Sequence, residues 1–297
     1  MSSGETINAM TVDVEDWFQV SVLRNKIRFE DWHRQECRIQ RNIDRILTLF
    51  SEHKVKGTFF VLGWIAEHFP QVVKDIKAEG HEIGCHSYAH KVIFEHSRED
   101  FVEDLHRSTA LIEDLTGNPI EFYRAPSWSI TRDSLWALEV LVERGFKYDS
   151  SLFPVKHDLY GIEDVPRFPF YMEFVNGGKI TEFPPSTLRI AGNNVPFAGG
   201  GYLRLFPYTF VKQGIRSLNR KGHPVVFYFH PWEIDPGQPR VDIKGLSKIR
   251  HYTNLEETEN RLRDLVKSFK FSTLSDVMRQ APITLRWPDF NGVHERK

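Results

Sequence analysis

Short apolar runs that end in polar side chains are the feature that most constrains how this chain folds. Residues 57–62, Gly-Thr-Phe-Phe-Val-Leu, form a continuous apolar run of strand length, typical of a strand covered on both faces. Residues 39–53 instead place their apolar side chains on one stripe of a helix. Strands that alternate with helices predict an α/β fold, a parallel sheet with outer helices that is either open or closed into a barrel.

The same alternation continues along most of the chain. It predicts strands at 7–14, 81–85, 120–124, 146–149, 225–229 and 269–274, and helices at 70–79, from Phe101 to Leu115, at 132–144, at 208–221 and at 255–268. Thr131 and Asn254 are the predicted caps of two of these helices. Residues 150–205 are rich in Pro, Gly and Phe and are predicted to form an irregular or β-rich insertion. No linker or repeat separates domains, so we expect a single domain over 1–297.

Functional side chains are expected where these strands end, because the carboxyl ends of parallel strands meet at one edge of the sheet. The segments at the strand ends are Asp13-Val-Glu-Asp16, His86-Ser-Tyr-Ala-His90, Arg124-Ala-Pro126-Ser-Trp128, Asp149-Ser-Ser151 and His230-Pro-Trp-Glu233. Five strand ends that all carry polar side chains predict one shared site.

His86 and His90 are the strongest indication of a metal. Four residues apart on a helical turn, two imidazoles share one face and reach a single divalent ion. Two His and a carboxylate, with positions left open for water, are typical of a catalytic metal site. The alternative for the pair taken alone is chance spacing among 13 His residues.

The acidic segment supplies the candidates for the other roles. Asp13, Glu15 and Asp16 are candidates for the third ligand and for a general base that takes a proton from the attacking water. A solvated acidic turn or a helix N-terminus is the alternative interpretation.

Three further groups complete the predicted site. Arg124 is suited to a bidentate pair with a carboxylate, or else to an ordinary surface salt bridge. His230 follows an apolar strand and is suited to protonating a leaving group, although a core histidine is the competing interpretation. Rings beside these residues are predicted to form flat walls for sugar rings: Tyr88, Trp128 and Trp232.

Composition excludes several classes of function. The 39 Lys and Arg balance 40 Asp and Glu, so no basic field exists to bind nucleic acid or an anionic membrane. No stretch approaches the roughly 20 apolar residues that span a bilayer, and no signal peptide is visible, so we expect a cytoplasmic protein. Cys37 and Cys85 cannot form a disulfide framework, and Cys85 is expected to be a buried thiol. Gly199-Gly-Gly201 lacks the Lys-Ser/Thr of a phosphate loop.

Taken in order, these segments resemble the motifs of the polysaccharide deacetylases of carbohydrate esterase family 4, which share the NodB-homology fold. Thr11-Val-Asp13-Val-Glu15-Asp16 is an altered form of the first motif, T-F-D-D-G. His86-Ser-Tyr-Ala-His90 matches H-S/T-x-x-H, Arg124-Ala-Pro126 matches R-x-P, and His230 resembles the late catalytic His. This resemblance covers about residues 7–235.

A closer resemblance is to the exosortase-associated deacetylases of exopolysaccharide gene clusters, and it runs nearly end to end. The segments that carry it are DVEDWFQV (13–20), FPVKHDLYG (153–161), GGGYLRLFP (199–207), YFHPWEID (228–235) and His251-Tyr-Thr-Asn-Leu. It implies a subfamily-specific C-terminal segment at about 236–297. Val14 occupies the slot where the family has its metal carboxylate, so that ligand shifts to Glu15 or Asp16. Glu15 is preferred because it shares Asp13's side of an extended strand.

The resemblance implies a distorted (β/α)7 barrel that removes acetyl groups from N-acetylhexosamine units of a bacterial polysaccharide or its precursor. It implies a divalent metal, Zn or alternatively Co, Ni or Mn, with Asp13 as base, Arg124 holding Asp13, and His230 as acid. Trp128, Tyr88, Pro126 and Trp232 are the candidate substrate-binding residues. The expected partner is an N-acetylated saccharide, with no nucleic acid and no membrane span, and a homo-oligomer is compatible with the sequence.

Two other functions stay open at this point. One is hydrolysis of a C–N bond in a small molecule, of the allantoinase or imidase type, because some relatives of this fold have that activity. The other is a catalytically silent saccharide-binding protein, which Val14 in the ligand slot keeps open.

Overall fold

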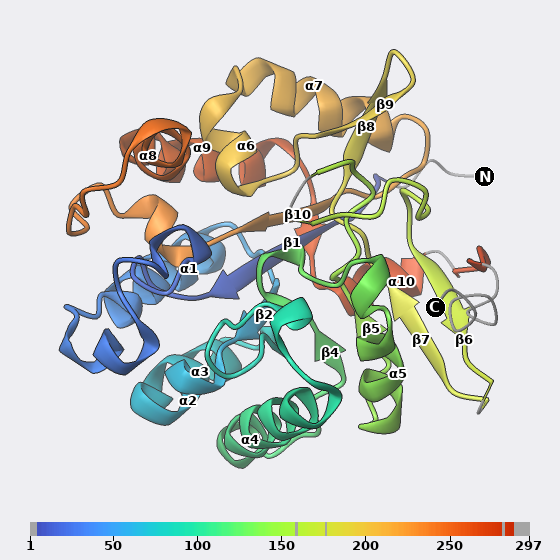
Figure 1. The fold of residues 1–297 in the computed structure, drawn as a ribbon. Helices are drawn as coiled ribbons and strands as arrows, with labels where there is room; N and C mark the ends of the chain where they lie inside the picture. The colour runs from blue at the N-terminus through green and yellow to red at the C-terminus, as the bar shows by residue number, and fades with distance from the viewer. Residues whose placement is uncertain (1–4, 158–159, 176, 281–282, 288–297) are drawn as a thin grey trace.

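A curved, mostly parallel sheet organises the computed structural model, which describes residues 5–157, 160–175, 177–280 and 283–287. In these residues nine strands form one sheet, in the order β10-β1-β2-β3-β4-β5-β7-β6, and β11 pairs with β1 beside it (Figure 1). The bounds are β1 Asn8–Val14, β2 Thr58–Val61, β3 Glu82–Cys85, β4 Phe122–Tyr123, β5 Tyr148–Asp149, β6 Phe170–Glu173, β7 Lys179–Glu182, β10 Val226–Phe229 and β11 Phe271–Ser272. Only β6 runs antiparallel, to β7. A separate hairpin pairs β8 (Thr187–Ile190) with β9 (Asn193–Pro196).

Helices surround this sheet on its outside (Figure 1). The α-helices are α1 Ile39–Glu52, α2 Gly63–His68, α3 Pro70–Ala78, α4 Arg98–Thr116, α5 Trp136–Glu143, α6 Gly200–Leu205, α7 Tyr208–Asn219, α8 Gly245–Tyr252, α9 Leu255–Ser268 and α10 Leu274–Gln280. Six 3-10 helices lie in the loops of the described residues: η1 Ser21–Leu23, η2 Phe29–Arg34, η3 Ile93–Glu95, η4 Pro126–Trp128, η5 Arg132–Ser134 and η6 Pro231–Ile234. None of the helices in the described part of the chain is long and apolar enough to cross a membrane.

Every strand and helix predicted from the sequence is present, with differences at the ends of elements, whereas α2, α6, α8 and α10 were not predicted. The predicted helix at 132–144 begins as η5 and continues as α5, and the last strand is only β11. Capping of α9 by the Asn254 side chain is wrong, because that amide donates to the Arg204 carbonyl oxygen instead. Cys37 and Cys85 are free thiols, and Cys85 is buried as expected.

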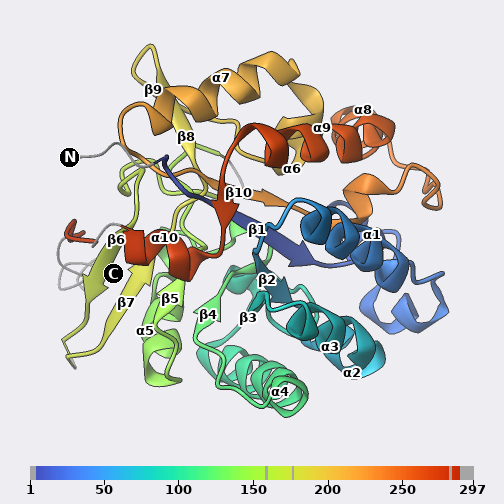
Figure 2. The same ribbon diagram turned by 180° about the vertical axis from the view of Figure 1, so that it is seen from behind.

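The sheet curls into an incomplete barrel of the predicted (β/α)7 type. Between β7 and β10 the described residues form no continuous ladder, but the Ser186 N–H donates to the Val226 carbonyl oxygen at 3.3 Å. The amino-terminal end of the barrel is closed by α10, which lies left of the centre when the molecule is seen from behind (Figure 2). The Leu274 N–H donates to Thr58 Oγ1 at 3.0 Å, and Ser275 donates to Glu82, so α10 lies against the first residues of β2 and β3.

Alternation along the strands decides which side chains enter the barrel. Successive residues of a strand point to opposite faces, so one face of each strand packs on the helices and the other points inward. A cluster of buried residues links the inward positions of several strands with α10: Ala9, Phe60, Phe122, Phe183, Val226, Leu274 and Val277. Asp13, Arg124 and His230 follow Ala9, Phe122 and Val226 by two or four residues along the same strand direction. Because these intervals are even, they point to the same face of the sheet as those three residues. They therefore enter the interior at the carboxyl end.

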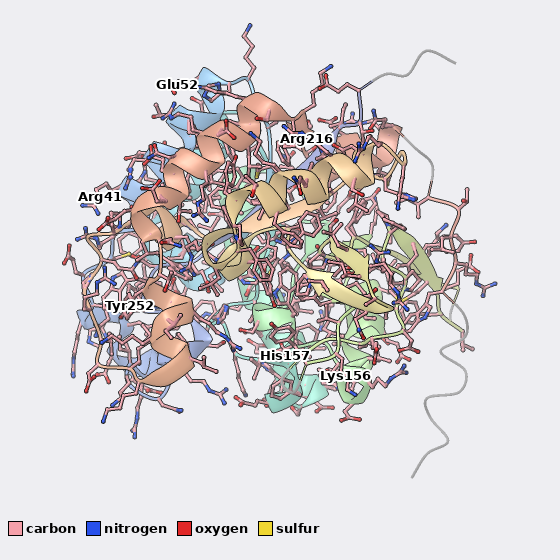
Figure 3. The ribbon with its side chains drawn as sticks, turned by 90° about the horizontal axis from the view of Figure 1, so that it is seen from above. Arg41, Glu52, Lys156, His157, Arg216 and Tyr252 are labelled. Carbon is pink, nitrogen blue, oxygen red and sulfur yellow. The ribbon has the colours of Figure 1, made fainter. Side chains whose placement is uncertain are left out.

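The second half of the chain completes the same barrel. Residues 150–205 contribute β6 and β7 to the main sheet, and α9 is tied to α1 by ion pairs from Arg45 to Glu259 and from Arg263 to Glu52. In the view from above, Arg41 of α1 and Tyr252 of α8 lie on one side of the molecule, and His157 of the insertion lies toward the other (Figure 3). The two halves of the chain thus enclose one interior.

The three consecutive glycines lie where the chain passes β10. Gly199 has φ +121° and forms a bridge with Tyr228, and a Cβ atom at Gly199 would lie 1.8 Å from the Tyr228 carbonyl oxygen. Gly201, in α6, has ordinary φ and only distant neighbours. The segment is therefore a close backbone contact, in agreement with the rejection of a phosphate loop.

We predict that Gly199→Ala destabilises the protein by about 3 kcal/mol or more, because the new methyl group collides with backbone that cannot move without shifting β10. Gly201→Ala is the matched control and should leave stability within about 1 kcal/mol of the wild type, since alanine is favourable in a helix. Urea unfolding followed by circular dichroism measures both variants. Equal stability of the two variants would contradict this account of Gly199.

Candidate active site

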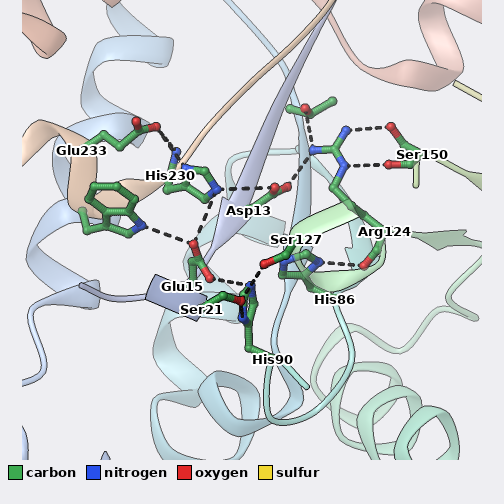
Figure 4. A network of polar contacts seen from close by, with 12 residues as sticks. Asp13, Glu15, Ser21, His86, His90, Arg124, Ser127, Ser150, His230 and Glu233 are labelled. Atoms are coloured by element: carbon green, nitrogen blue, oxygen red, sulfur yellow. Dashed lines mark hydrogen bonds and ion pairs between the residues drawn. The ribbon is translucent and has the colours of Figure 1, made fainter. Parts of the chain in front are cut away.

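The site lies at the carboxyl ends of β1, β3, β4 and β10 and in the loops that follow them. Figure 4 shows its polar network, which connects Asp13, Glu15, His86, His90, Arg124 and His230. All of them come from segments that the sequence singled out. Asp13, Glu15, His86 and Arg124 are each less than 4% exposed, so the group is built inside the protein.

Arg124 holds Asp13 in the barrel interior. Its Nη1 donates to Asp13 Oδ1 at 2.6 Å and to Thr11 Oγ1 at 2.8 Å. The other nitrogens donate to Ser150, Nη2 to its Oγ at 2.7 Å and Nε to its carbonyl oxygen at 3.1 Å. The pair with Asp13 therefore uses one nitrogen, and the expected bidentate geometry is wrong because Ser150 takes the remaining donors. Every nitrogen of the buried guanidinium has a partner, which offsets the cost of its burial.

Glu15, His86 and His90 form a group suited to a metal ion. One possible ligand atom from each residue lies within 4.8 Å of the others, and in the described part of the chain this group alone meets that test. The ring centroids of the two imidazoles are 5.3 Å apart. His86 Nδ1 lies 2.7 Å from the Arg124 carbonyl oxygen, so Nδ1 carries the proton and Nε2 keeps a free lone pair.

The residues present fit a divalent ion. Glu15 Oε2 is buried and makes no hydrogen bond, although His90 Nε2 is only 2.9 Å away. A carboxylate oxygen that faces a ring nitrogen without a hydrogen bond is the arrangement of two ligands of one cation. Burial lowers the pKa of His86 to about 4, which keeps it neutral. Burial would raise the pKa of Glu15, but His90 and His230 outweigh this effect and lower it to about 2. A neutral imidazole and a carboxylate are the forms that bind a metal.

The loop from His86 to His90 is not helical, so the predicted helical turn is wrong. Ser87 and His90 have φ values of 63° and 51°, in the left-handed region, and the imidazoles approach each other through this turn. The carboxylate of Asp104, from α4, accepts the Tyr88 N–H at 3.0 and 3.1 Å and so supports the loop from below. The four-residue spacing correctly indicated that the two imidazoles lie close together, but a non-helical loop and not a helical turn brings them there.

His230 is oriented by two residues that the sequence did not reveal. His230 Nδ1 lies 3.0 Å from Glu233 Oε2, and Arg204 Nε donates to Glu233 Oε1 at 2.7 Å. His230 Nε2 then faces Asp13 Oδ2 at 3.8 Å and Glu15 Oε1 at 3.5 Å. Burial would lower the pKa of His230, but the charges of Glu15 and Glu233 outweigh it and raise the pKa to about 9. The ring is therefore a cationic donor.

Trp232 and Trp128, which were predicted to form flat walls for sugar rings, instead contact the charged residues of the site. Trp232 is 5% exposed, stacks on His230 with 5.4 Å between ring centroids, and its Nε1–H donates to Glu15 Oε1 at 3.2 Å. Its ring therefore positions Glu15 and His230. Trp128 lies beside Arg124, whose guanidinium carbon is 4.8 Å from the ring centroid. The backbone N–H of Trp128 donates to the Ala125 carbonyl oxygen at 3.3 Å.

Two residues that were predicted for the site, Asp16 and Tyr88, lie outside this group. A third, Pro126, takes part in the local hydrogen bonding only through its backbone. The Asp16 carboxylate accepts from the N–H groups of Trp17 and Arg38, because the chain turns after β1 and carries Asp16 toward the start of α1. The Tyr88 hydroxyl donates to Glu67 on α2, which takes its ring away from the histidines. Pro126 is buried in η4, where its carbonyl oxygen accepts from the Ser129 hydroxyl at 2.6 Å.

Four further residues belong to the site, and the sequence carried only a partial signal for them. Glu233 stands in the strand-end segment His230-Pro-Trp-Glu233, and Ser150 in Asp149-Ser-Ser151, so a search for partners of His230 and Arg124 within these segments would have found both. Arg204 and Asp104 lie in helices distant in sequence. Only the tertiary structure shows that they reach the site.

We predict that Arg124→Met destabilises the protein by about 3–5 kcal/mol, because it leaves the Asp13 carboxylate buried without its cation. The double variant Asp13→Asn, Arg124→Met should recover part of that loss, since the remaining amide carries no charge. The free energies of unfolding in urea of the wild type, both single variants and the double variant together form a double-mutant cycle. Additive effects of the two substitutions would show that the pair does not interact.

A second prediction concerns Asp104. Burial raises the pKa of Asp104 to about 7, against 3.8 for a free side chain. The raised value means that its contribution to stability is present below the unfolded pKa and is lost as the pH rises through 7. Asp104→Asn should therefore gain about 2–3 kcal/mol relative to the wild type between pH 5 and pH 8. Urea unfolding at both values measures the difference. A difference that does not change with pH would refute the assignment.

Comparison with known proteins follows the two halves of the chain. Residues 27–146 match the family model "Polysaccharide deacetylase", and residues 150–279 match a domain of unknown function, DUF3473. A peptidoglycan deacetylase of Helicobacter pylori is 36% identical over 110 residues, which are 37% of this chain and 36% of that protein. The matched region thus spans about a third of the relative's own length.

Solved structures share the fold over nearly the whole chain. A Mycobacterium smegmatis protein assigned to the polysaccharide deacetylases superposes with a TM-score of 0.63 at 20% identity, covering 97% of this chain and 96% of that one. The Puue allantoinase gives a TM-score of 0.61 at 15% identity, covering 94% and 90%. Residues 27–146 are thus similar in sequence to the polysaccharide deacetylases, and the chain shares its fold with these two solved structures over nearly its whole length.

Proposed function

We propose that this protein hydrolyses the acetamido group of an N-acetylated sugar residue and releases acetate. The observation that carries the proposal is the position of a buried carboxylate, Asp13, and a cationic imidazole, His230, beside the Glu15, His86 and His90 group (Figure 4). Amide hydrolysis needs a base for the attacking water, a stabilised carbonyl oxygen and an acid for the amine, and these residues supply groups for each requirement.

The first proton transfer falls to Asp13. Arg124 occupies Oδ1 of this carboxylate and leaves Oδ2 facing the histidines, so Oδ2 is the atom that takes the proton of the attacking water. A divalent ion held by Glu15, His86 and His90 would supply a Lewis acid that lowers the pKa of water and polarises the amide carbonyl. Two nitrogens and one oxygen are a ligand set compatible with Zn, and also with Co, Ni or Mn.

The second proton transfer falls to His230. An amine is a poor leaving group unless it is protonated as the C–N bond breaks, so a cationic donor is required on the leaving side. Glu233 accepts from Nδ1–H and fixes the direction of the cationic ring, so its second N–H, on Nε2, is aimed into the site. Arg204 holds Glu233 in turn. The relay of Arg204, Glu233 and His230 thus prepares the acid before substrate binds.

The substrate class follows from the family and from the absence of a strong net charge. The matched relative is described as a peptidoglycan deacetylase, and we extend the deacetylase activity, by proposal, to this chain. A net charge of −1 suits an uncharged N-acetylated saccharide better than a polyanion. The resemblance of this chain to the exosortase-associated deacetylases favours an exopolysaccharide or its precursor as the substrate. On this proposal the enzyme acts on that substrate in the cytoplasm, before export.

We predict that His86→Ala lowers acetate release from chito-oligosaccharides by at least about 1,000-fold and abolishes stoichiometric metal binding, because it removes one of three ligands. The measurements are acetate release and metal content of purified protein by mass spectrometry. His106→Ala, which removes an exposed imidazole from α4, is the matched control and should retain both.

Three outcomes would overturn this proposal. Wild-type acetate release by His86→Ala would remove the metal group from the reaction. Hydrolysis of cyclic ureides with no acetate release from chito-oligosaccharides or peptidoglycan fragments would assign the same residues to a small-molecule amidohydrolase. Binding of saccharide with no metal and no hydrolysis would leave a silent binding protein.

A further inference from the structure

Helix α8 has an apolar outer face that the described part of the chain leaves uncovered. Leu246 and Ile249 are 67% and 53% exposed, and residues three positions apart lie side by side on a helix, so the two form one apolar strip. The inner side of α8 is fixed by His251. Its buried ring stacks on Trp232 with 4.5 Å between centroids, and its carbonyl oxygen accepts from Arg204 Nη1 at 3.0 Å. The strip therefore faces solvent on a helix that is firmly held from within.

Positive charge surrounds this apolar strip. The segment 236–252 carries four cationic side chains and one acidic side chain, all of them exposed: Arg240, Lys244, Lys248, Arg250 and Asp242. From the net charge of −1 we expected no attraction to an anionic membrane. That value describes the whole chain and conceals a local excess of positive charge around α8.

The loop after β1 has the same composition on the same side of the molecule. Val22 on η1 and Phe29 on η2 are 38% and 41% exposed, and Lys26 and Arg28 between them are exposed as well. This loop, drawn in blue, and α8 both lie toward the left in Figures 1 and 3. The two segments follow β1 and β10, whose carboxyl ends carry the site. Apolar and basic side chains therefore flank the site on two sides.

We propose that α8 and this loop dock the protein on a bilayer surface that contains anionic lipids. Helices that lie in such a surface combine aliphatic side chains on one face with Lys and Arg beside them. The aliphatic side chains insert at the level of the acyl chains, while the long basic side chains extend to the phosphate groups. Interfaces between proteins are instead depleted in lysine and enriched in aromatic residues, so the composition of α8 favours a bilayer over a protein partner.

Docking of this kind goes beyond the proposed function and is independent of it. The outer face of α8 contacts the lipid, whereas its inner face reaches the site through Trp232, which stacks on His230 with 5.4 Å between ring centroids. A docked protein would therefore present its site close to saccharides that are attached to the bilayer.

The test measures sedimentation of the purified protein with vesicles of equal parts phosphatidylglycerol and phosphatidylcholine. Binding should be at least about tenfold tighter than to vesicles of phosphatidylcholine alone, and it should weaken as NaCl rises from about 0.05 M to about 0.5 M, because salt screens the charges. The double variant Lys244→Gln, Lys248→Gln should bind the anionic vesicles roughly thirtyfold more weakly. The double variant Leu246→Gln, Ile249→Gln should bind at least about tenfold more weakly, because it removes the inserted apolar surface.

Glutamine is favourable in a helix and all four side chains are exposed, so both double variants should fold as the wild type does. Lys74→Gln on α3 and Val175→Gln between β6 and β7 are the matched controls. They remove exposed side chains of the same kinds and should leave vesicle binding unchanged. Acetate release from chito-oligosaccharides in solution should also be unchanged in both double variants, which separates docking from the proposed reaction.

Three results would overturn the docking surface. The first is the absence of wild-type binding to the anionic vesicles. The second is equal binding by the wild type and both double variants. The third is a wild-type dimer that does not bind vesicles and that Leu246→Gln, Ile249→Gln converts to a monomer, which would assign the outer face of α8 to a second copy of this chain.

Discussion

The buried ion pair between Arg124 and Asp13 is the interaction on which the rest of the site depends. An arginine without solvent contact inside a barrel interior is costly unless its nitrogens find partners, and here Thr11, Asp13 and Ser150 supply a partner for each of the three. The guanidinium also lies over the Phe60 ring at 4.2 Å. These contacts join β1, β2, β4 and the residue after β5, so the position of Asp13 and the curvature of the sheet are set together.

Around this pair the two halves of the chain contribute different parts of the chemistry. His86, His90 and Arg124 lie in the region that matches the polysaccharide deacetylase model, whereas Ser150, Arg204, His230 and Glu233 lie in the region that matches the domain of unknown function. Asp13 and Glu15 precede both. Because β1 pairs with β2 on one side and with β10 on the other, its carboxyl end brings the three groups together. The close passage of Gly199 along Tyr228 keeps β10, and with it His230, in register.

Most of the fold and half of the site could be predicted from the sequence for one physical reason. A buried strand shows as a short apolar run, and its alternation assigns side chains to one face, so Asp13, Arg124 and His230 could be placed at one rim from local patterns alone. Tyr88 and Asp16 show where this reasoning stops. Both lie in loops beyond the strands, where no periodicity operates. Their directions are set by partners distant in sequence, Glu67 on α2 for Tyr88 and the backbone of Arg38 for Asp16.

The sequence by itself determined most of the strands and helices, the strand ends that carry polar side chains, and the preference for Glu15 over Asp16. Tertiary structure decided that Glu15 does lie beside the two histidines, that Trp232 supports Glu15 instead of forming a wall for a sugar ring, and that Arg204 and Glu233 orient His230. The reason is the range of the interactions. Strand and helix patterns arise between residues a few positions apart, whereas a buried charge must find its partner wherever the fold brings one within hydrogen-bond distance.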